Sequence, residues 1–165
     1  MSEFNIQTAT EDGICHIRLT GRLTFAMSQR FDAFIDTLAL ENLADIIIDL
    51  RKADYLDSTI LGLVAKIARS FIARAHRKPT LLSSREDMNL LLESMGFDSA
   101  FEIRVSAAVT PFLLDDIPVP AEEAPTPETL LEAHKLLMDL DDRNIDRFST
   151  AVETLEGTLE RKKSG

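Results

Sequence analysis

The amino-acid sequence predicts an α/β domain in which helices cover a mixed central sheet of about four to five strands. Three observations support this prediction. Two segments near the start alternate apolar and polar residues, the run Ile46–Ile48 is continuously apolar, and a wide apolar stripe with helical spacing follows Ser58. Strands that alternate with helices after an opening hairpin are typical of this fold class.

The first forty residues predict a β-hairpin and a helix. Apolar residues alternate with polar ones over 4–8 and 15–19, and Gly13 between them can adopt the positive φ of a tight turn. Cys15 falls on the apolar side of the second strand and is the single cysteine of the chain, so we expect a buried thiol. Apolar residues at helical spacing over 31–38 predict the helix.

The middle of the chain continues the same alternation of strands and helices. The run Ile46–Ile48 predicts a strand that is buried on both faces, and residues 51–57 predict a short loop that leads to a helix beginning at Ser58. Pro79 follows the end of this helix, because proline cannot continue it. The remaining predicted elements are a strand at 80–82, a helix over 88–95 that Gly96 ends in a left-handed conformation, and a strand at 101–105.

Composition divides the chain into three parts. We assign residues 1–105 to the α/β domain, 106–126 to a proline-rich acidic linker and 127–163 to a C-terminal helical extension. The apolar seam of the extension changes phase across 141–144, so it is either one long helix or a helical hairpin. This seam must be buried against the α/β domain, against another protein or against a second copy of the chain.

Charge and hydropathy exclude two classes of partner. The formal net charge of −10 argues against nucleic acid, whose phosphates an acidic protein repels. No apolar run approaches the ~18 residues that a membrane-spanning helix needs. Residues 1–5 lack the basic and apolar regions of a signal peptide, so we expect a cytoplasmic protein.

The sequence predicts no catalytic, metal-binding or cofactor-binding site. Asp49 ends an apolar strand, as the phosphoacceptor of a response-regulator receiver does, but residues 20–22 lack the acidic pair that would hold magnesium. A serine hydrolase would need a base beside Ser58 and a G-x-S-x-G elbow, which is absent. The three histidines, His16, His76 and His134, fall in the hairpin, at a helix end and in the extension, so we expect no catalytic triad.

Ser58 lies where a long helix begins, among unpaired backbone N–H groups at the positive end of the helix dipole. A hydroxyl at this point either caps the helix or accepts a phosphate, and position alone favours the cap. Asp57 could cap the helix by itself, and Thr59 could accept a phosphate in place of Ser58.

Segments 45–50 and 55–62 together resemble the STAS domain of bacterial anti-sigma factor antagonists. Residues 21–24 are similar to the Gly-x-Leu-Asp segment that follows the second strand of that family, and residues 93–101 are similar to its closing helix and strand. The resemblance covers about Phe4 to Val105. It implies a STAS-like fold with the helical extension added to it.

The resemblance also implies a switch between partners. The unphosphorylated protein would bind an anti-sigma factor that is also its serine kinase and would thereby free a sigma factor. Phosphorylation of Ser58 would abolish the complex, a serine phosphatase would restore it, and Asp57 would orient the hydroxyl or contact the kinase. The partner-binding residues that the resemblance implies are Thr24, Met27, Asp57, Ser58, Thr59 and Ile60.

Two of these residues depart from the family pattern, since Ile60 replaces a common glycine and Thr24 replaces a common acid. Both departures bear on which partner is bound. An alternative function is a STAS scaffold or sensing module in a larger regulatory complex, in which the helices of the extension mediate assembly through self-association or through another protein.

Overall fold

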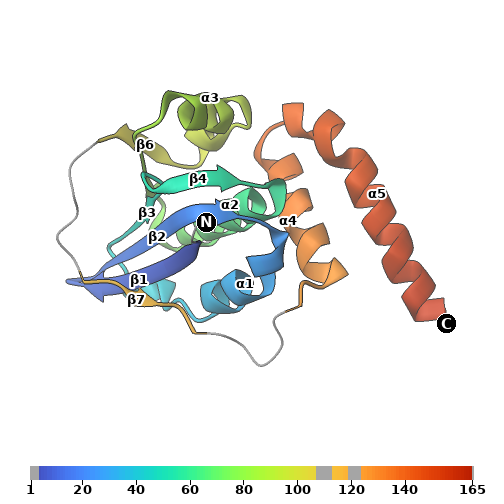
Figure 1. The fold of residues 1–165 in the computed structure, drawn as a ribbon, viewed down its shortest axis with the longest axis horizontal. Helices are drawn as coiled ribbons and strands as arrows, with labels where there is room; N and C mark the ends of the chain where they lie inside the picture. The colour runs from blue at the N-terminus through green and yellow to red at the C-terminus, as the bar shows by residue number, and fades with distance from the viewer. Residues whose placement is uncertain (1–3, 107–112, 119–123, 165) are drawn as a thin grey trace.

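A computed structural model describes residues 4–106, 113–118 and 124–164. Its centre is a mixed seven-stranded sheet in the order β6-β5-β3-β2-β1-β7, with β4 paired to β2 beside this path (Figure 1). The pairs of β2 with β3, β3 with β5 and β5 with β6 are parallel, whereas β1 is antiparallel to both β2 and β7. The strands are β1 (Asn5–Glu11), β2 (Ile14–Leu23), β3 (Asp45–Asp49), β4 (Ala53–Leu56), β5 (Thr80–Ser83), β6 (Glu102–Val105) and β7 (Asp115–Asp116).

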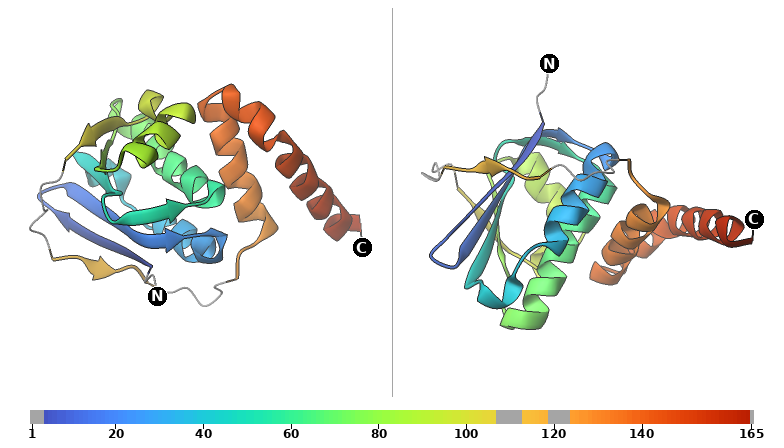
Figure 2. Two further views of the ribbon diagram at one scale, coloured as in Figure 1. Left: turned by 45° about the horizontal axis from the view of Figure 1, so that its top comes forward. Right: turned by 90° about the horizontal axis from the view of Figure 1, so that it is seen from below.

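The described residues form five α-helices, which build two layers beside the sheet. Seen from below, the sheet is followed by α1 and α2, and then by α4 and α5 (Figure 2). The helix α4 packs against α2, and α5 packs against α4, so we call α4 and α5 the α4–α5 hairpin. The helices are α1 (Ser28–Asp36), α2 (Ser58–Ala75), α3 (Glu86–Ser94), α4 (Pro127–Leu140) and α5 (Arg143–Ser164).

The core lies between the sheet and the first helical layer. Ile46 and Ile48 of β3 are fully buried, and so are Phe31 of α1 and Phe71 of α2. Ile47, which points to the opposite face of the sheet, is only partly buried, so the prediction of a strand buried on both faces holds for one face alone. Cys15 is also buried, which confirms the expected core thiol. The apolar stripe of α2 is wide enough to serve both of its neighbours, because the helix packs on the sheet and also against α4.

The structure confirms the predicted α/β fold but adds strands to the sheet. Residues 53–56, predicted as part of a loop, form β4 and pair in parallel with β2. Asp115 and Asp116, which fall in the predicted linker, form β7 along the edge of β1. Residues 107–112 and 119–123 of that linker lie outside the described residues. The extension consists of two helices, since Asp141 is extended between α4 and α5.

Candidate functional site

The N-terminal end of α2 is capped by Asp57 and not by Ser58. One carboxylate oxygen of Asp57 accepts from the backbone N–H of Ile60 at 3.0 Å, which is the usual bond of a helix cap. The other oxygen accepts from the backbone N–H of Phe25 at 2.6 Å and so joins the loop after β2 to the helix. Asp57 therefore does the structural work, and the hydroxyl of Ser58, the first helical residue, is not needed for capping.

The hydroxyl of Ser58 instead contacts the extension. Its Oγ lies 2.9 Å from Nε2 of His134 on α4. Nδ1 of the same ring lies 2.6 Å from the backbone oxygen of Leu130. A carbonyl oxygen can only accept, so Nδ1 carries a proton, and in the neutral tautomer that this bond selects Nε2 accepts from the hydroxyl of Ser58. The sequence gives no reason to expect a histidine beside Ser58, but α4 folds back onto α2 and brings His134 there.

This contact does not make a hydrolase of the Ser58 and His134 pair. In a catalytic triad, a carboxylate orients the imidazole and stabilises the imidazolium that forms. Nδ1 of His134 is bonded to a neutral amide carbonyl, which orients the ring without supplying a charge. Ser58 also lies in regular helix and not on the strained turn of a nucleophile elbow.

Close backbone packing holds α4 against α2 one turn beyond Ser58. A Cβ built on Gly62 would lie 2.6 Å from the carbonyl carbon of Ala133, a separation that real side chains do not adopt. Lys66, one turn further along α2, bonds to Asp32 of α1 at 2.7 Å and to Glu132 of α4 at 2.6 Å. Burial alone would lower the pKa of Lys66, but hydrogen bonds to these two carboxylates raise that pKa above its ordinary value. Lys66 therefore ties three helices together.

A pocket of about 610 Å³ opens beside Ser58, between the end of β4, α3 and α5. Asp57 and Arg147 are the two charged residues that line it, and Phe148 and Leu91 supply apolar walls. The ring of Phe148 also meets the ring of His134 edge to face, with centroids 5.5 Å apart. One side of Ser58 thus faces His134, and another faces a pocket with an arginine on its wall.

The structure places the predicted partner-binding residues unevenly. Asp57, Ser58 and Thr24 are partly exposed at the same end of the domain, and Thr24 caps the short turn that begins at Phe25. Thr59, Ile60 and Met27 are buried, with exposed fractions of 3%, 0% and 7%. These three residues cannot serve as contacts in this conformation, because their side chains fill the core below the helix end. Burial also makes Thr59 a poor alternative to Ser58 as a phosphoacceptor.

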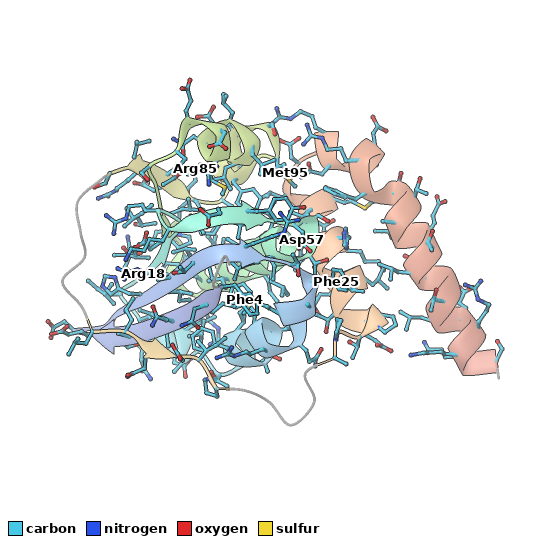
Figure 3. The ribbon with its side chains drawn as sticks, in the orientation of Figure 1. Phe4, Arg18, Phe25, Asp57, Arg85 and Met95 are labelled. Atoms are coloured by element: carbon cyan, nitrogen blue, oxygen red, sulfur yellow. The ribbon has the colours of Figure 1, made fainter. Side chains whose placement is uncertain are left out.

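Two exposed aromatic side chains, Phe25 and Tyr55, lie beside the site, and the sequence predicts neither of them as a site residue. Phe25 is 51% exposed and lies beside Asp57 on the side of the domain that faces the extension (Figure 3). Tyr55 is 42% exposed, and the guanidinium of Arg22 stacks on its ring at 4.0 Å from the centroid. Tyr55 begins the motif segment 55–62, and Phe25 directly follows residues 21–24, but aromatic residues in such positions are more often core, so the sequence offers no signal for their exposure.

Asp49, weighed above as a possible phosphoacceptor, is part of a buried ion-pair cluster. Nε of Arg51 lies 2.9 Å and Nε of Arg18 lies 3.3 Å from its carboxylate oxygens. Burial would raise the pKa of Asp49, but the hydrogen bonds from Arg51 and the charge of Arg18 lower it below its ordinary value. These contacts give Asp49 a structural role at the end of β3.

Residues 4–106, 113–118 and 124–164 contain no group of three histidine, cysteine, aspartate or glutamate side chains that could hold a metal ion. The same residues also contain no helix that is long and apolar enough to cross a membrane.

The fold and the site define an α/β domain with a partly buried serine hydroxyl at the N-terminal end of α2. A profile of the STAS domain family matches residues 5–109, which is more than half of the chain. The chain therefore belongs to the STAS domain family. Both helices of the α4–α5 hairpin lie outside the matched residues.

Two solved structures are similar to this chain. An anti-sigma factor antagonist from Mycobacterium paratuberculosis is 14% identical, with a TM-score of 0.53, over 61% of this chain and 85% of that one. The Bacillus cell fate determinant SpoIIAA in its phosphorylated form is 22% identical, with a TM-score of 0.48, over 62% and 91%. Comparison with curated protein sequences gives no match. At 14% identity, the likeness to the mycobacterial protein establishes the fold and not the function.

Proposed function

We propose that the protein is an anti-sigma factor antagonist whose binding is controlled by phosphorylation of Ser58. The observation that supports this proposal most directly is the division of labour between two adjacent residues. Asp57 caps α2, so the hydroxyl of Ser58 can be modified without loss of the cap. The hydroxyl also lies at a pocket, in the segment that matches the STAS family, and one solved structure that is similar to this chain is described as an anti-sigma factor antagonist.

The proposed partner is an anti-sigma factor with serine kinase activity, which binds the unphosphorylated protein and thereby releases a sigma factor. Phe25 and Tyr55 offer it exposed apolar area next to Asp57 and Ser58. The partner transfers the γ-phosphoryl group of ATP to Oγ of Ser58, with release of ADP and the hydroxyl proton. A serine phosphatase reverses the modification, and the protein itself is not an enzyme.

Charge explains why the modified protein leaves its partner. A phosphate adds about −1.5 to −2 charges beside Asp57, and a surface fitted to a hydroxyl cannot bury that charge without repulsion and a desolvation penalty. The helix cap remains in place, so the modified protein stays folded. A change from 99% bound to 99% free corresponds to about 5.5 kcal/mol, which charge and steric conflict together supply.

The test combines labelling with binding. Incubation with the cognate kinase and ATP should label Ser58 in the wild type and in Thr59→Val, and should leave Ser58→Ala unlabelled. Ser58→Ala should bind the kinase constitutively, and Ser58→Asp should bind about a hundredfold more weakly. Ser70→Asp is the matched control, because it adds the same charge to α2 three turns away from the site and should bind normally. Unchanged affinity of both Ser58→Asp and the phosphorylated protein would falsify the switch.

A further inference from the structure

The extension gives Ser58 a neighbour that the STAS domain alone would not provide. His134 belongs to α4, outside the residues that match the family, and its Nε2 is the hydrogen-bond partner of the Ser58 hydroxyl. Three other contacts fix α4 at this position: the close approach at Gly62, the ion pair between Lys66 and Glu132, and a hydrogen bond of 3.2 Å from Thr129 to Gln29. A phosphate on Ser58 would therefore form at the junction of two packed helices.

Phosphorylation changes what Ser58 can offer to His134. The hydroxyl proton that Nε2 accepts is lost when the phosphate ester forms, and the new group has only acceptor oxygens. Nδ1 keeps its proton for the oxygen of Leu130. Nε2 must then either lose its bond or take a proton from solvent and donate it to the phosphate. The second outcome replaces a neutral hydrogen bond with a charge-assisted one.

Arg147 supplies a second cation on the wall of the adjacent pocket. Its Nη1 donates to the backbone oxygen of Ser94 at 3.0 Å and to Oδ1 of Asn144 at 3.2 Å, which holds the side chain against α3. Both of these bonds use the same nitrogen, so the rest of the guanidinium can turn toward a new acceptor. Guanidinium is well suited to bind a phosphate through two parallel hydrogen bonds. The pocket, at about 610 Å³, has room for the group.

We propose that a phosphate on Ser58 is bound by the extension of the same chain, through His134 of α4 and Arg147 of α5, so that phosphorylation locks the α4–α5 hairpin over the end of α2. This inference rests on the proposed phosphorylation of Ser58. The ligand of the site is a phosphomonoester dianion. Arg147 in the pocket lining and a protonated His134 beside Ser58 together outweigh the charge of Asp57, the one acid of that lining. The modified protein then loses its partner because its own hairpin covers the surface, in addition to the direct repulsion.

The test uses the full chain with phosphoserine inserted genetically at position 58, and it requires neither kinase nor partner. Hydrogen exchange of the amides in 127–164 is measured with and without the phosphate. We expect exchange to be about tenfold slower in the phosphorylated protein, because charge-assisted bonds replace a neutral one. Equal or faster exchange would overturn the inference, since it would mean that the phosphate leaves the hairpin unaffected or expels it.

Variants assign the effect to the two cations. Slowing by phosphate should disappear when His134→Gln is combined with Arg147→Gln, and it should persist in Arg161→Gln, which removes the same charge from the far end of α5. If the double variant does not fold, Arg147→Gln alone replaces it. Arg147 is exposed, so this single variant should fold, and it should lose part of the slowing by phosphate. Undiminished slowing without the two cations would refute the site. The labelling and binding assays above do not depend on this exchange measurement. Phosphorylation of Ser58 and binding of the phosphate by the hairpin are therefore tested separately.

Discussion

The backbones of α2 and α4 touch where Gly62 lies against Ala133, and the absence of a side chain at Gly62 is what permits this approach. Glycine within a helix is otherwise unfavourable by about 1 kcal/mol relative to alanine. The position therefore trades helical stability for contact between the domain and its extension. Since Ser58 is one turn away, the same contact sets the distance between its hydroxyl and His134.

Gly62→Ala should separate the α4–α5 hairpin from α2. The added methyl group would overlap the backbone of Ala133, and overpacking of this kind costs about 1–3 kcal/mol. Gly157→Ala on α5 is the matched control, because a Cβ there meets nothing closer than 3.5 Å and should stabilise its helix. Relative to the wild type, hydrogen exchange over 127–164 should be faster and the melting temperature lower in Gly62→Ala. In Gly157→Ala, exchange should be slower and the melting temperature higher.

His134→Ala should make Ser58 a better substrate for its kinase. The variant loses the bond to Oγ and the edge-to-face contact with Phe148, which contribute about 0.5–1.5 kcal/mol each. The hairpin then opens more often, and the rate of labelling at Ser58 should rise several-fold. His76→Ala, which changes an exposed histidine at the other end of α2, should leave the rate unchanged. A labelling rate insensitive to His134 would show that the hairpin does not limit access.

Glu132→Gln should weaken docking of the hairpin by a small amount that depends on salt. The ion pair with Lys66 is partly exposed, so its contribution should fall in the range of about 0.2–1 kcal/mol. Asp139→Asn breaks the pair with Arg69, in which both side chains are about two-thirds exposed, and should have no measurable effect. Urea unfolding at low and high ionic strength distinguishes the two variants, and equal losses would contradict the role given to Lys66.

Acid should loosen the turn between α4 and α5. Hydrogen bonds from the side chain and backbone of Arg143 lower the pKa of Asp141 to about 2, from an ordinary value of 3.8. A carboxyl with a depressed pKa adds stability above its ordinary value and loses that contribution as the pH falls through the depressed one. The difference in unfolding free energy between wild type and Asp141→Asn should therefore be constant above about pH 5 and shrink toward pH 2. A difference that does not vary with pH over this range would assign the effect to shape and not to charge.

Most of the domain follows from local patterns in the sequence. The run Ile46–Ile48 predicts a strand because a short uninterrupted apolar run is typical of a buried strand, although Ile47 is only partly buried. Gly96 predicts a helix end because its φ of 83° is unfavourable for other residues. The start of α4 at Thr126 and Pro127 is equally local and is confirmed. In each case one physical requirement acts on a few neighbouring residues.

The elements that escaped prediction depend on distant partners. Residues 53–56 are too short and too mixed in polarity to indicate a strand, and they become β4 only because β2 offers parallel hydrogen bonds. The contact between Ser58 and His134 spans 76 residues and arises from the packing of α4, which no local pattern specifies. Asp57 and Ser58 are both good caps, so their neighbours in space had to decide which one does the capping.

The anchoring of Ile117 has a consequence for competition between the hairpin and any other protein. Ile117 is buried, and its backbone oxygen accepts from Arg30 at 2.7 Å, so the chain is fixed to the domain only ten positions before α4 begins at Pro127. A connecting segment this short keeps the α4–α5 hairpin at an effective concentration in the millimolar range relative to its docking surface on α2. A rival present at about micromolar concentration must therefore overcome a roughly thousandfold disadvantage through affinity alone. A change that weakens the anchor at Ile117 or the docking of the hairpin would shift this competition toward the other protein.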